Sequence, residues 1–128
     1  MSSLKSKSKM VWAGRVISIL VVLPFIASVI GKLMGGAEVS AGMAHVGIPE
    51  SLLLPLAVIE GLCVVIYLIP QTCVLGAILF TGYIGGTIVT HLRLSENVIM
   101  QISLGVLVWL GLYLRDGRIR ELIPLRKS

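Results

Sequence analysis

The sequence predicts an all-α integral membrane protein, in which four antiparallel helices form a bundle and the first outer loop holds a short interfacial helix. The first observation is composition: the chain has 128 residues, of which 56% are hydrophobic and 13% are charged. A soluble domain would carry about 25% charged residues. The second observation is patterning: four apolar runs are separated by short polar segments, and four spans of about 20 residues use most of the chain. One membrane domain therefore accounts for the whole sequence.

The chain divides into three parts, which are a basic N-terminal tail at 1–10, a membrane domain at 11–115 and a basic C-terminal tail at 116–128. Within the domain, the expected spans lie at about 11–34, 51–69, 73–92 and 98–114. The segment 35–50 is too polar and too short to cross a membrane. Because glycines and Pro49 bracket it, we expect a loop with a helix at about 38–45.

The net charge of +5 is concentrated at the two ends of the chain. Lysines and arginines that flank apolar spans are typical of cytoplasmic anchors and not of a nucleic-acid-binding stripe. The positive-inside rule therefore predicts that both termini are cytoplasmic. The loops at 35–50 and 93–97 would then face outward.

The second and third spans carry polar side chains at mid-depth and further out. Tyr83, Thr87 and His91 are four residues apart and share one stripe of a helix. Glu60 stands inside the second span, where a carboxyl costs on the order of 2.5–3.5 kcal/mol unless it is protonated, paired or solvated. Counted from the outer ends at about 1.5 Å per residue, Glu60 and Tyr83 lie at the same depth of roughly 13–14 Å. The tight turn at Pro70 makes their helices neighbours, so these side chains are predicted to share a pocket.

Further polar residues are expected to close the outer end of this pocket. Structural explanations stay open for two of the residues: Glu60 as a protonated group that bonds two helices, and Lys32 as a lysine that reaches the lipid headgroups. The functional interpretation makes Lys32 a cation that faces the pocket. The candidate catalytic residues are Glu60, His91 and Tyr83, and the candidate substrate-binding residues are Lys32, Thr87, Arg93, Gln101 and His45.

The third span also carries closely spaced glycines. Gly82 and Gly86 have the Gly-x-x-x-Gly spacing that lets membrane helices approach closely, and Gly85 lies beside them. We expect these glycines to press against another helix of the same chain. A homodimer stays open as the alternative.

Other kinds of site receive no support from the sequence. Cys63 and Cys73 are ten residues apart and do not form a Cys-x-x-Cys motif, so they are either core side chains or a redox pair. No regularly spaced set of metal ligands is present, and no glycine-rich phosphate loop follows a strand. We therefore expect no metal site and no nucleotide site.

One stretch resembles a known family. The run Tyr-Ile-Gly-Gly-Thr-Ile-Val-Thr-His-Leu-Arg at 83–93 resembles the third-helix signature of the DoxX-like family of small four-helix bacterial membrane proteins. The segment 69–77 is similar to the family's Pro-containing turn, and Gly31-Lys32 and Glu60-Gly61 are similar to further family positions. The resemblance runs from about residue 15 to 115. It implies a multi-pass protein of the bacterial inner membrane.

The resemblance also implies a set of functions. Lys32, Glu60, His91 and Arg93 match recurring family positions, and some relatives are linked to quinone-coupled sulfur oxidation or to redox complexes. Three alternatives stay open. The first is an oxidoreductase or other membrane enzyme subunit, whose outward-opening pocket binds a quinone or a lipid-like substrate. The second is a small proton-coupled transporter with Glu60 as the exchanging carboxyl. The third is a non-catalytic accessory protein of a membrane complex. The expected partners are the lipid bilayer, an apolar small molecule, and a partner subunit or a second copy of the chain. Nucleic acid is not expected as a partner.

Overall fold

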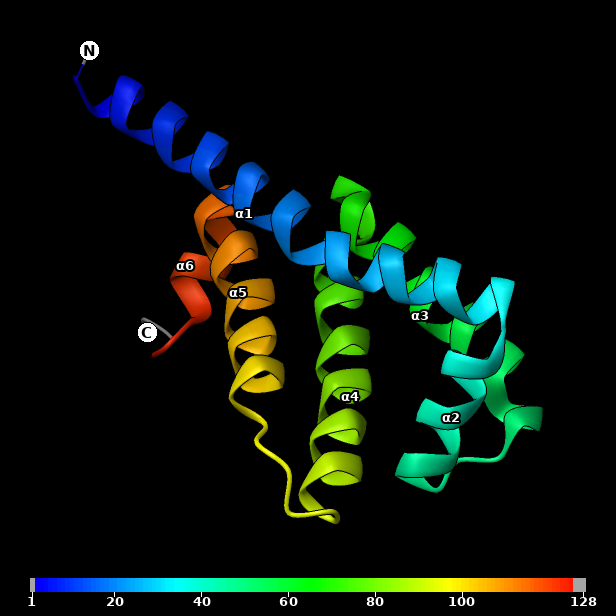
Figure 1. The fold of residues 1–128 in the computed structure, drawn as a ribbon. Coiled ribbons are helices and arrows are strands. Elements are labelled where there is room, and N and C mark those ends of the chain that lie inside the picture. The colour runs from blue at the N-terminus through cyan, green and yellow to red at the C-terminus, as the bar shows by residue number, and fades with distance from the viewer. Residues whose placement is uncertain (1, 126–128) are drawn as a thin grey trace.

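The computed structural model describes residues 2–125, and over this range the chain is helical without any strand, as Figure 1 shows. The all-α class is therefore confirmed. The helices are α1 (Ser2–Met34), α2 (Ala37–Val46), α3 (Leu53–Leu68), α4 (Cys73–Leu92), α5 (Ile99–Arg115) and α6 (Gly117–Leu122), with short 3-10 turns η1 (Glu50–Leu52) before α3 and η2 (Pro70–Thr72) before α4.

Three helical stretches are long and apolar enough to cross a membrane: Ser6–Met34, Glu50–Leu68 and Pro70–Leu92. The helix Ile99–Arg115 is also apolar, but it is shorter. Large hydrophobic side chains cover the outward faces of these helices; Leu20 and Leu54, for example, are 59% and 62% exposed. So much exposed apolar surface is characteristic of a protein that contacts lipid.

Each of the four long helices packs against two of the others: α1 and α4 both contact α3 and α5. Aromatic rings fill the space between them. The ring of Phe80 from α4 lies 4.7 Å from that of Phe25 in α1 and 5.5 Å from that of Tyr67 in α3. From α5, Val108 and Leu112 are fully buried in the same core.

The core is tightest at one end, which we call the terminal end because α1 meets the C-terminal end of α5 there. At this end glycines allow the helix backbones to approach closely. A Cβ atom at Gly76 would lie 2.3 Å from Cα of Tyr67, and one at Gly14 would lie 2.6 Å from the backbone nitrogen of Arg115. A Cβ atom at Gly111 would lie 2.7 Å from Ser18 Oγ. We call the opposite end, beside α2 and the α4–α5 loop, the loop end.

The expectation that Gly82, Gly85 and Gly86 press against another helix of the chain is wrong. A Cβ atom at any of these three positions would have no neighbouring atom of the described chain within 4 Å. Helical spacing shows that residues share a face, but it does not show what lies opposite that face. Gly82 and Gly86 instead line a cavity between α4 and α2.

Two helix boundaries differ from the expected ones. Helix α1 begins at Ser2, ahead of the apolar run, because lysine and methionine are good helix formers and extend the helix beyond the hydrophobic part. The short helix expected at 38–45 is α2, Ala37–Val46. It lies between Gly36 and Gly47, whose φ angles of 110° and 76° suit glycine and end the helix at both sides.

Candidate functional site

A cluster of polar side chains surrounds Glu60 within the helices. Glu60 is only 1% exposed, and its Oε2 atom accepts hydrogen bonds from Tyr83 Oη at 2.6 Å, Lys32 Nζ at 2.7 Å and Ser28 Oγ at 3.2 Å. Lys32 Nζ also donates to Ser28 Oγ at 2.5 Å. The cost of burying the carboxylate is thus offset by one positive charge and by hydrogen bonds from two hydroxyls.

Three helices position this cluster. Ser28 and Lys32 are one turn apart on α1, so both side chains point to the same side of the helix. Glu60 comes from α3, and Tyr83 comes from α4. The side chain of Lys32 is 17% exposed, so most of it lies within the protein, where its ammonium group contacts Glu60.

The cluster leaves one carboxylate oxygen free. Within residues 2–125, all three hydrogen bonds to the Glu60 side chain reach Oε2, and none reaches Oε1. A ligand with a hydroxyl or amide hydrogen can therefore donate to Oε1 without breaking the internal pair.

A cavity of about 300 Å³ adjoins the cluster on the side of α1 and α5. Its polar wall contains Glu60, Tyr83, Thr87, His91 and Gln101. The Oε1 atom of Gln101 is buried and has no hydrogen-bond partner in the described part of the chain. An unsatisfied buried acceptor calls for an explanation, and a bound ligand that donates a hydrogen bond supplies one.

A second cavity, of about 350 Å³, lies on the other side of the polar stripe, between α2, α3 and α4. It shares Lys32, Tyr83, Thr87 and His91 with the first cavity. The rest of its wall is mainly apolar, with side chains such as Met43 and Leu56, and two glycines of α4 leave it open. The stripe of Tyr83, Thr87 and His91 that helical spacing predicted therefore borders a cavity on each of its two sides.

An acidic residue of the α4–α5 loop joins α2 to α4 at the loop end. One oxygen of Glu96 lies 3.1 Å from His91 Nδ1, and the other lies 3.3 Å from His45 Nε2. Hydrogen bonds from His91 and then from His45 hold the pKa of the Glu96 carboxyl below its ordinary value. Beside this contact, Arg93 donates to the backbone carbonyl of Val46. These contacts hold α2 over the loop end of the helices.

The structure places the candidate residues in three groups. Glu60, Tyr83 and Lys32 are in direct contact through hydrogen bonds. Thr87, His91 and Gln101 line the cavity beside them, although Thr87 Oγ1 donates to the carbonyl of Ile84 within its own helix. His45 and Arg93 line neither cavity and instead make the contacts between α2 and the end of α4.

Two residues of this region were not among the candidates. Ser28 lies one turn before Lys32, and this spacing was the signal that could have added it to the cluster. Glu96 lies in a loop, where helical periodicity carries no information. Its role follows only from the path of the loop, which brings it between His45 and His91.

Comparison with known proteins supports the resemblance carried by the third span. Searches of curated proteins and of solved structures gave no match. A family-wide sequence profile, described as the DoxX-like family, matches residues 16–111. This range includes the whole polar cluster and both cavities at the loop end. The chain, a membrane protein with apolar spanning helices, belongs to the DoxX-like family.

Proposed function

We propose that the chain is a protein of the bacterial inner membrane, in which α1, α3, α4 and α5 form an antiparallel transmembrane four-helix bundle. Helix α5 has 17 residues and is about 25 Å long, which is near the lower limit for a spanning helix. Both termini would be cytoplasmic, because basic residues such as Arg15, Arg115 and Arg120 lie at the terminal end. The loop end and α2 would then lie at the outer interface.

We further propose that the cavity beside Glu60 opens outward and binds an apolar molecule with a polar head, such as a quinone. The protein would be an oxidoreductase subunit or another membrane enzyme subunit. One observation carries this proposal: the buried Oε1 atom of Gln101 lacks a hydrogen-bond partner in the described chain. Glu60, whose three hydrogen bonds all reach Oε2, lines the same cavity. Its volume of about 300 Å³ lies at the lower end of the range for small-molecule sites, which is roughly 300–1,000 Å³.

The chemistry of such a site follows from its donors and acceptors. A quinol head has a hydroxyl at each end of its ring, and these would donate to Glu60 Oε1 and to Gln101. The oxidised head has carbonyls instead, which would accept from Lys32 or from the amide hydrogens of Gln101. Glu60 and His91 are the proton-exchanging groups in this proposal, and His91 can pass a proton outward through Glu96. The two electrons that leave a quinol together with its two protons would pass to an electron-accepting cofactor of a partner subunit.

A second function is favoured by a different observation. The ion pair between Lys32 and Glu60 is complete without any ligand, and with Tyr83 it joins three helices. The cluster would then have a structural role in an accessory protein that assembles with a membrane complex.

Thermal unfolding in detergent with a short-tailed quinone distinguishes these two functions. A ligand that binds only the folded state raises the melting temperature as its concentration increases. We expect this rise for the parent chain and for Gln71→Leu, a matched control at an exposed position outside both cavities. Gln101→Leu should abolish it. Absence of any rise in the parent, or an equal rise in Gln101→Leu, would instead support the accessory role.

A further inference from the structure

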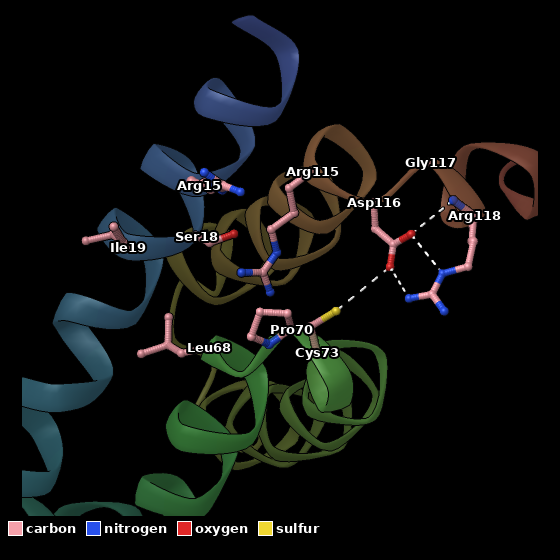
Figure 2. Close-up of a pocket in the computed structure, with 10 residues that line it drawn as sticks. All are labelled: Arg15, Ser18, Ile19, Leu68, Pro70, Cys73, Arg115, Asp116, Gly117 and Arg118. Carbon is pink, nitrogen blue, oxygen red and sulfur yellow. Dashed lines mark hydrogen bonds and ion pairs between the residues drawn. The ribbon is translucent and has the colours of Figure 1, made fainter. Parts of the chain in front are cut away.

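A separate cavity of about 500 Å³ opens at the terminal end, where α1 meets the start of α4 and the junction of α5 with α6 (Figure 2). Three arginines line it: Arg15 from α1, Arg115 from the end of α5 and Arg118 from α6. Asp116 is the acidic residue on this wall. The wall therefore carries an excess of positive charge, which favours an anionic occupant.

Asp116 forms an ion pair with Arg118 within the protein. Its Oδ2 atom accepts from Arg118 Nη2 at 2.9 Å, and its Oδ1 atom accepts from Arg118 Nε at 3.2 Å. Hydrogen bonding from Arg118 holds the pKa of Asp116 below its ordinary value, so the carboxylate stays charged and paired at neutral pH. Arg118 thus forms the ion pair with Asp116, and neither Arg15 nor Arg115 makes an ion pair with a carboxylate in the described part of the chain.

The side chain of Arg115 is held in place, but one of its hydrogen-bond donors has no acceptor in the described chain. Its Nη2 atom donates to the carbonyl of Tyr67 at 2.6 Å, and its guanidinium carbon lies 4.7 Å from the centre of the Tyr67 ring. Its Nε atom is buried and has no hydrogen-bond partner in the described chain. A fixed guanidinium with an unmet donor is a preorganised anion-binding group.

Arg15 is the second uncompensated cation. It is exposed, and it makes no hydrogen bond or ion pair with residues 2–125. Its backbone is nevertheless fixed, because the adjacent Gly14 lies in the close crossing of α1 with α5. Figure 2 shows the side chains of Arg15 and Arg115 on the part of the wall formed by α1 and α5, with Pro70 opposite.

The edge of this cavity is apolar. Ile19 of α1 and Leu68 of α3 line it while they are 53% and 38% exposed. A free inorganic anion would gain nothing from these side chains. A phosphate that carries acyl chains would cover them and reduce their exposure.

We propose that this cavity binds the phosphate group of an anionic phospholipid, with Arg15 and Arg115 contacting the phosphate and with Ile19 and Leu68 against an acyl chain. Guanidinium groups match phosphate oxygens in charge and in planar geometry. The site shares no lining residue with the cavity beside Glu60, so the two proposals can fail separately.

Native mass spectrometry of the full chain in detergent tests this proposal. The protein is titrated with phosphatidylglycerol and, separately, with phosphatidylcholine. We expect one phosphatidylglycerol to be retained more strongly than phosphatidylcholine. Arg15→Gln should weaken that binding about fivefold, which is the effect of removing one basic residue near an anionic lipid surface. Its melting temperature should not change, because Arg15 has no partner in the described chain.

The matched control is Lys9→Gln, which removes the same charge from an exposed position of α1 outside the cavity. It should bind phosphatidylglycerol as the parent does. An equal loss in both variants would mean diffuse attraction and would overturn the site, as would equal retention of the two lipids by the parent. In a third arm, inorganic phosphate should leave the bound phosphatidylglycerol in place. Displacement by inorganic phosphate would overturn the assignment to a lipid.

Discussion

The ammonium group of Lys32 lies 2.7 Å from the carboxylate of Glu60, and this ion pair joins α1 to α3 in the interior of the protein. Tyr83 Oη donates to the same carboxylate oxygen from α4 at 2.6 Å. Because Glu60 is almost completely buried, these partners offset the cost of its burial. The pair therefore has two consequences, one for stability and one for binding, and they can be measured separately.

For stability, we expect the single variants Lys32→Met and Glu60→Gln to be destabilised by about 3 kcal/mol each, because each leaves a buried group without its partner. The double variant should lose much less than the sum of the two, since it leaves neither charge behind. Denaturation in detergent measures all three variants. Strictly additive losses would show that the two side chains do not interact. The double variant should fold and yet bind no quinone.

The contact of Glu96 with the two histidines predicts a dependence on pH. The pKa of Glu96 is lowered from its ordinary value of 4.5 by hydrogen bonds from His91 and His45. A lowered pKa stabilises the folded state above that ordinary value, and the stabilisation is lost as the pH falls through the lowered pKa. We expect hydrogen-exchange protection of α2 to fall as the pH drops below about 4.5. Glu96→Gln should lack this step; a step of the same size in that variant would assign it to another group.

Two glycines of α4, Gly76 and Gly86, are expected to respond in opposite ways to substitution by alanine. Gly76→Ala should destabilise the protein by roughly 1–3 kcal/mol, because the added carbon would overlap Cα of Tyr67. Gly86→Ala has open space and should be neutral or should stabilise the helix by up to about 1 kcal/mol. Melting temperatures in detergent provide the comparison. A large loss in Gly86→Ala would indicate that another copy of the chain covers this face.

The proposed topology is tested by cysteine labelling in cells. Single cysteines at Ser40 and Ser95 should react with a membrane-impermeant reagent from outside. The native Cys63 and Cys73 are buried and give the background level. Reaction of either position only from the cytoplasm would invert the orientation and would place the cavity beside Glu60 on the inner side.

Much of the site was predictable where helical periodicity carries the information. The four-residue spacing of Tyr83, Thr87 and His91 predicted a shared stripe, and all three line both cavities at the loop end. The depth count placed Glu60 level with Tyr83, and these side chains are hydrogen-bonded. Periodicity and depth succeed here because a helix fixes both the direction and the height of a side chain.

Other features were not predictable from the same information. The rotation of α4 about its axis decides that Gly82 and Gly86 face a cavity, and the spacing of the glycines is the same for any rotation. Loop paths decide that Arg93 turns to the carbonyl of Val46 and that Glu96 meets two histidines. The terminal cavity depends on where α6 packs against α5, and the basic sequence of the C-terminal tail does not specify that position.

The most direct test of the central claim is mass-spectrometric mapping of a photoreactive quinone that is cross-linked to the protein in native membranes. If the cavity beside Glu60 binds the quinone head, adducts should map to α4 near Tyr83 and to α5 near Gln101. Excess unlabelled quinone should remove them. Adducts that are confined to lipid-facing residues such as Leu54 and Val106, or that resist this competition, would contradict a quinone site within the helices.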